Sequence, residues 1–156
     1  MKKLLVAAIV MLAMCACSGD REYIDVRGLS MGMKASVMAD SMQARGLSLD
    51  TLHSGENSIV LVDTLANTYT FTIYHNNDTI SDVMEIYTAS YNDSTSNLWQ
   101  TRHDELEKEF GWPNMPKRGD LHKIAFFRND KGSVQLELIN TNWPTLNIHY
   151  SIETTE

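Results

Sequence analysis

Five histidines and twenty acidic residues are the side chains of this sequence that could hold a metal ion or move protons. The histidines are His53, His75, His103, His122 and His149. None follows another at the spacing of three or four residues that places two imidazoles on one ion, and no H-E-x-x-H motif occurs. We therefore expect neither a metal site nor a cofactor.

One group of adjacent polar residues, His103, Asp104 and Glu105, lies in a segment with helical spacing. Consecutive residues of a helix point about 100° apart. We therefore expect these three side chains not to converge on one ion, and we predict that they form a solvated helix face.

Acid–base chemistry is the other reaction class that the sequence could support. Asp63 and Glu85 lie in strand-like segments and, with a histidine, could act on a glycan or peptide as a hydrolase. Any acidic chain offers such pairs by chance. No G-x-S-x-G motif occurs, no cysteine follows Cys17, and the eight glycines are dispersed rather than gathered in a phosphate-binding loop. We predict no catalytic residue and expect a protein that is not an enzyme.

The first residues of the chain have the order of a secretory signal. Lys2 and Lys3 precede the apolar run 4–13, and Cys15 and Cys17 close the segment. This run is too short to remain as a membrane-spanning helix. Both cysteines of the chain lie here, so they cannot form a disulfide framework in the rest of the chain.

The end of this segment resembles the signal of bacterial lipoproteins, in which a cysteine is acylated and becomes the new N-terminus. Ala16 supplies the small residue before Cys17, whereas bulky Met14 precedes Cys15, so Cys17 is the preferred lipid attachment site. An ordinary cleaved signal is the alternative. The resemblance implies a signal peptide over 1–16, a tether over 17–22 and a single domain over 23–156. Ser18 after the cysteine implies sorting to the outer membrane, with the periplasmic or surface face left open.

The net charge of −7 restricts the partners of the chain. No Lys/Arg cluster is present, so we expect no binding to nucleic acid. An acidic domain is also repelled by an anionic membrane surface. The expected membrane contact is therefore the lipid anchor alone.

The pattern of apolar residues predicts an α+β domain. Segments 33–45 and 96–110 have helical spacing, and each ends at a glycine, Gly46 or Gly111, followed by a large apolar residue. Alternating or apolar strand-like runs occupy 23–29, 58–65, 69–74, 79–89, 123–128, 133–139 and 145–152, and 113–120 is expected to be a loop. We predict a single antiparallel sheet of about six or seven strands with both helices on one face. The order of helix and three strands occurs twice, which suggests a duplicated αβββ unit.

Three short motifs connect the chain to a known group of proteins. They are Gly28-Leu29-Ser30-Met31, Arg45-Gly46-Leu47 and Phe110-Gly111-Trp112-Pro113. In these motifs the chain resembles a group of small Gram-negative lipoproteins of unknown function. Because the motifs end or connect structural elements, the resemblance implies a fold and a location rather than an activity.

Three tryptophans are candidate contact residues. We expect Trp99 to lie in the core and Trp112 to pack back on the end of the second helix. Trp143 lies between the last two strands, where it could contact a sugar ring or a protein partner, or pack at a strand end.

The sequence thus favours an envelope-anchored, non-catalytic binding or assembly module with a protein or envelope component as partner. The alternatives are an exported inhibitor or immunity-like protein, and a minor glycan or peptide hydrolase. The oligomeric state stays open.

Overall fold

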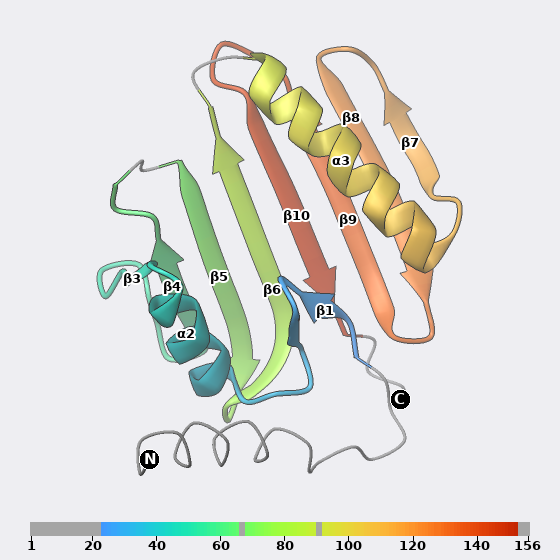
Figure 1. Cartoon of the computed structure of the whole chain (residues 1–156). Helices are drawn as coiled ribbons and strands as arrows, with labels where there is room; N and C mark the ends of the chain where they lie inside the picture. The colour runs from blue at the N-terminus through green and yellow to red at the C-terminus, as the bar shows by residue number, and fades with distance from the viewer. Residues whose placement is uncertain (1–22, 66–67, 90–91, 153–156) are drawn as a thin grey trace, which may run out of the picture.

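The computed structural model describes residues 23–65, 68–89 and 92–152 (Figure 1). The expected signal peptide and tether, with Cys15 and Cys17, lie outside the described residues. The strands are β1 (Asp25–Val26), β2 (Leu29–Ser30), β3 (Ser48–Leu49), β4 (Ser58–Val62), β5 (Tyr69–Asn76), β6 (Thr79–Thr88), β7 (Asn114–Arg118), β8 (His122–Asn129), β9 (Gly132–Ile139) and β10 (Thr145–Ser151). The helices are α2 (Ala35–Ala44) and α3 (Asn92–Phe110). No helix among these residues is both long and apolar enough to cross a membrane.

The main sheet is antiparallel and has eight strands in the order β3-β4-β5-β6-β10-β9-β8-β7. The predicted α+β class is confirmed, but the predicted number of six or seven strands is wrong. The two additional strands form the edges: β3 has only two residues, and β7 contains Pro116, Lys117 and Arg118 without an apolar alternation. Short, charged and proline-containing edges resist pairing with another chain, and for the same reason they lack a clear strand pattern.

The segment 23–29 is the second departure from the predicted sheet. Arg27 and Gly28 have φ values of 57° and 71°, so the chain reverses there and β1 pairs with β2 in a separate two-stranded sheet. Figure 1 shows this hairpin in front of β6 and β10, between the two helices. Its apolar residues join the main core. Ile24, Val26, Leu29 and Met31 are all buried.

Both helices cover the same face of the main sheet (Figure 1). α2 packs on β4 and β5, and α3 packs on β8, β9 and β10. Alternate residues of the strands point into this layer, as Val134, Leu136 and Leu138 do on β9. Met31, Met38 and Met42 are buried in the same core.

The glycines that end the helices adopt the predicted left-handed conformation. Gly46 and Gly111 have φ values of 103° and 81°, and the amide of Leu47 donates to the carbonyl of Met42. The predicted contact of Trp112 with the helix end is wrong, because its side chain is 89% exposed. The chain leaves α3 for β7 at the outer edge of the sheet, beyond the main core. Trp99, in contrast, is buried as predicted.

Candidate functional site

Glu85 on β6 is the most deeply buried charged side chain among the described residues, with 0% exposure. It stands on the helix-facing side of the sheet, opposite Phe71 on β5 and Ile148 on β10. A carboxylate without water requires partners for about four lone-pair sites. Four donors meet that requirement, three on one oxygen and one on the other.

Three tyrosine hydroxyls and one arginine donate to this carboxylate. Arg27 Nε, Tyr69 Oη and Tyr87 Oη each lie 2.7 Å from Oε2, and Tyr150 Oη lies 2.9 Å from Oε1. The rings of Tyr69 and Tyr87 have centroids 4.6 Å apart. The guanidinium carbon of Arg27 lies over both rings, 5.8 and 5.5 Å from their centroids, which adds cation–π attraction. We call these five residues the Glu85 hub.

The hub connects the β1–β2 hairpin to the centre of the sheet. Arg27 occupies the turn of the hairpin, and its carbonyl accepts a hydrogen bond of 2.7 Å from Nη1 of Arg45 after α2. From the other helix, Arg102 contributes a second positive charge that acts on Glu85 and Tyr150 through space. The carboxylate of Glu85 therefore links the hairpin to three strands of the main sheet, and Arg27 links the hairpin to Arg45 at the end of α2.

Two hub tyrosines are held in their neutral form. Burial raises the pKa of Tyr69 well above the ordinary value, and the adjacent charge of Glu85 raises it further. The same two causes raise the pKa of Tyr150. These phenols therefore act as hydrogen-bond donors to Glu85 throughout the neutral pH range.

The position of Glu85 in the hub does not suit the hydrolase considered for Asp63 and Glu85. A general acid must come within hydrogen-bonding reach of the substrate, and Glu85 has no exposed surface. Asp63 follows the end of β4, at the boundary of the β4–β5 loop.

The described histidines are spread over the fold rather than gathered. His53 pairs with Asp50 at 2.7 Å, and this hydrogen bond lowers the pKa of Asp50. On the sheet face opposite the helices, His122 pairs with Glu137 at 2.7 Å and His149 with Asp82 at 3.0 Å. His103 lies on α3, and His75 on β5.

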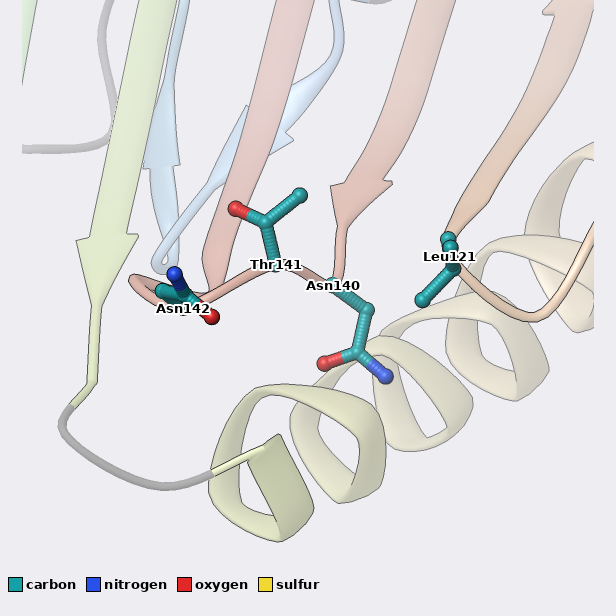
Figure 2. Close-up of a pocket in the computed structure, with 4 residues that line it drawn as sticks. All are labelled: Leu121, Asn140, Thr141 and Asn142. Carbon is teal, nitrogen blue, oxygen red and sulfur yellow. The ribbon is translucent and has the colours of Figure 1, made fainter.

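A hollow of about 570 Å³ lies at the end of the sheet where β9 turns into β10. Leu121, Asn140, Thr141 and Asn142 line it (Figure 2). Asn140 Oδ1 is buried without a hydrogen-bond partner. An unpaired buried carbonyl oxygen costs about 1–3 kcal/mol.

Trp143 follows the hollow in the same loop. Its side chain is 70% exposed, and that of Leu121 is 68% exposed. Pro144, the next residue, is buried and its carbonyl accepts a hydrogen bond from the amide of Ala89, so the loop is fixed to the neighbouring strand connection. The hollow thus combines amide and hydroxyl groups with one exposed apolar side chain, Leu121, and the exposed Trp143 follows it in the β9–β10 loop. Trp143 could be predicted as a contact residue because it lies between two strands in the sequence. Leu121 reaches the hollow only because β8 pairs with β9, which the sequence does not reveal.

The Glu85 hub predicts a large loss of stability when its charge is removed. In the Glu85→Gln variant the positive charge of Arg27 loses its partner, and the amide can no longer accept all four hydrogen bonds. We expect the free energy of unfolding to fall by about 3 kcal/mol, measured by urea denaturation. Asp82→Asn is the matched control on the same strand. Its half-exposed pair with His149 is worth less than about 1 kcal/mol, and equal losses in the two variants would contradict the role of the hub.

The raised pKa values of Tyr69 and Tyr150 predict a loss of stability at alkaline pH. Above pH ~10 the unfolded chain releases both phenolic protons and the folded chain retains them. The folded state then binds more protons, so stability falls as pH rises, by up to about 2.7 kcal/mol per pH unit for two groups. Urea denaturation between pH 9 and 11.5 measures this slope, and Tyr150→Phe should halve it. A slope that Tyr150→Phe leaves unchanged would show that Tyr150 ionises normally in the folded chain.

Comparison with protein families, with curated proteins and with solved structures finds no match for this chain.

Proposed function

We propose that this chain is an envelope-anchored lipoprotein whose domain acts as a non-catalytic binding or assembly module. The observation that carries the proposal is the β9–β10 loop, where Asn140, Thr141 and Asn142 line a hollow and the next residue, Trp143, is exposed. Partly apolar hollows with a few polar groups are the usual form of a binding site, and tryptophan is enriched among residues that dominate binding energy.

The Glu85 hub at the centre of the sheet supports a binding function rather than a catalytic one. The titratable groups of the Glu85 hub are turned inwards and occupied by one another. The exposed end of the sheet instead offers neutral amides, a hydroxyl and apolar surface. These groups recognise a partner by hydrogen bonding and contact area, without transferring protons.

The anchor of the module is the lipid on Cys17, which holds it at the outer membrane. The acidic charge of the chain supports this division of roles, because the domain itself is repelled by anionic lipid. We also infer that the two halves of the sheet descend from one αβββ unit. The sheet contains the strands β4-β5-β6 and then β10-β9-β8, so the last strand of one set of three pairs with the last strand of the other. One helix precedes each set in the chain.

Replacing Trp143 tests the binding surface. We expect Trp143→Ala to reduce recovery of the partner at least tenfold when the tagged full chain is captured from detergent-solubilised envelope. Trp112→Ala is the matched control, since Trp112 is 89% exposed but follows α3 instead of the β9–β10 loop. A partner lost equally from both variants, or retained by both, would overturn the assignment of this loop.

The same capture separates the alternative functions. If the captured protein is an enzyme that the chain inhibits, the inhibitor alternative is correct. Turnover of a glycan or peptide by the purified chain, with no stoichiometric partner, would contradict the binding proposal.

Replacing either cysteine tests the anchor. We expect Cys17→Ser to abolish acylation and release the chain from the membrane, whereas Cys15→Ser should leave both unchanged. Intact-mass spectrometry of the mature protein and its partition between membrane and soluble fractions are the measurements. Loss of the lipid in Cys15→Ser, with an acylated Cys17→Ser variant, would move the attachment to the other thiol. If neither cysteine is acylated in the mature protein, the alternative of an ordinary cleaved signal peptide is supported.

A further inference from the structure

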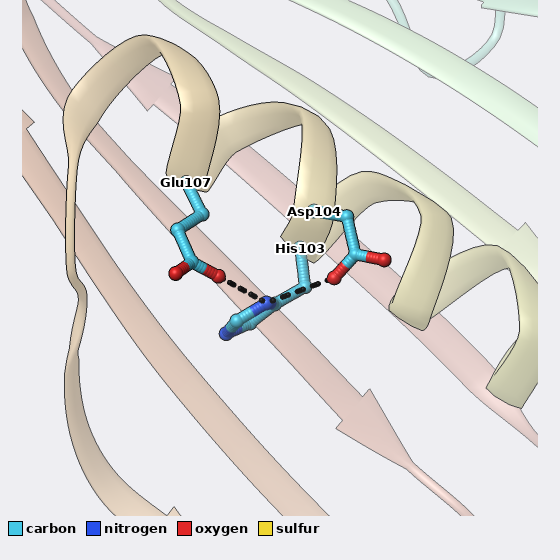
Figure 3. A group of neighbouring side chains, drawn as sticks. All are labelled: His103, Asp104 and Glu107. Carbon is cyan, nitrogen blue, oxygen red and sulfur yellow. Dashed lines mark ion pairs between the residues drawn. The ribbon is translucent and has the colours of Figure 1, made fainter.

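His103, Asp104 and Glu107 come together on α3 (Figure 3). His103 Nδ1 lies 3.6 Å from a carboxylate oxygen of Asp104 and 3.7 Å from one of Glu107. One ligand atom from each residue lies within 4.8 Å of the other two. Of the adjacent residues His103, Asp104 and Glu105, Glu105 does not join the histidine and pairs with Arg102 instead. Asp104 approaches His103, and Glu107, one helical turn further along, is the third member of the group.

The two distances are too long for direct hydrogen bonds. They are close to the separation of two ligands on one metal ion. With metal–ligand bonds of about 2.0–2.1 Å at tetrahedral angles, neighbouring ligand atoms stand roughly 3.4 Å apart. Small rotations of the two carboxylates, whose side chains are 53% and 30% exposed, would bring the three atoms to that spacing.

The imidazole of His103 is fixed in a position that suits a ligand. Its ring lies between Trp99 and Phe127, at centroid distances of 4.9 and 5.5 Å. Nδ1 is buried and has no hydrogen-bond partner. An imidazole nitrogen without a hydrogen accepts a hydrogen bond or binds a cation, and one with a hydrogen donates to an acceptor. Nδ1 faces two carboxylates, both too far away for a direct hydrogen bond.

A second contact orients one of the carboxylates. Gln100 Nε2 donates to Oδ1 of Asp104 at 2.8 Å. Hydrogen bonds of this kind hold metal ligands in place and raise the affinity of a site. The cluster thus has a fixed imidazole, a supported carboxylate and a third carboxylate one turn away.

We propose that His103, Asp104 and Glu107 form a binding site for a divalent transition-metal cation of the Zn²⁺ type. The three side chains supply one nitrogen and two oxygens, and water completes the coordination. Zn²⁺ accepts this mixed set, whereas Ca²⁺ and Mg²⁺ prefer oxygen ligands alone. The proposal is independent of the binding loop and of the anchor.

The test is titration of the full chain in detergent with Zn²⁺, using a variant background of Cys15→Ser and Cys17→Ser so that no thiol competes. We expect one equivalent to bind, measured by competition with a chromophoric chelator. Glu107→Gln and Asp104→Asn should each weaken binding at least tenfold while His103 stays in its packed position. Glu105→Gln, which removes the same charge from the same helix, should change the affinity less than twofold.

A second readout locates the ion. Histidine-selective nitrogen NMR should show one imidazole shifting on addition of Zn²⁺, and His103→Asn should remove that signal and the binding. The proposal is overturned by absence of one-to-one binding, by equal weakening in Glu105→Gln and Glu107→Gln, or by a shift of His122 or His149 instead.

Discussion

The buried negative charge of Glu85 is the constraint on which the rest of this structure depends. A carboxylate with no exposed surface is tolerated only if its partners replace the water that it has lost. Here these partners come from β5, β6, β10 and the turn between β1 and β2. The hydrogen bonds consequently fix the place where the two halves of the sheet meet and the position of the hairpin over that junction.

The ionisable groups of the Glu85 hub and the proposed binding loop lie in different parts of the fold. The centre of the helix-facing layer is closed by the hairpin and holds its ionisable groups neutral or paired. The end of the sheet carries the hollow and Trp143, away from that network.

Much of this fold could be predicted from the sequence because local rules determine it. The alternation in β9 and β10 and the glycines that end α2 and α3 depend on neighbouring residues alone. The edge strands β3 and β7 could not be found this way, because they lack a buried face. The apolar residues of 23–29 do not distinguish a strand of the main sheet from the hairpin that the chain forms, because the positive φ of Arg27 has no signal in the local pattern.

The Glu85 hub and the hollow are harder to predict from the sequence than the fold. Glu85 stands between Val83 and Tyr87 at an inward position of β6, a pattern that indicates a buried charge but not its partner. Arg27 lies 58 residues away and reaches Glu85 only because the hairpin folds over the sheet. The approach of Glu107 to His103, in contrast, follows from their spacing of four residues on a helix. Leu121 and Asn140 meet through strand pairing, which no local pattern specifies.

Amide hydrogen exchange of the full chain is the most direct measurement of the claim that the Glu85 hub holds the hairpin on the sheet. The amide of Met31 donates to the carbonyl of Ile24 and therefore reports closure of the hairpin. We expect the Met31 amide to exchange as slowly as the amides of β6 and β10, and all of them to exchange through one shared unfolding step. Fast exchange at Met31 beside a protected sheet would show that the hairpin opens independently and that Glu85 does not hold it.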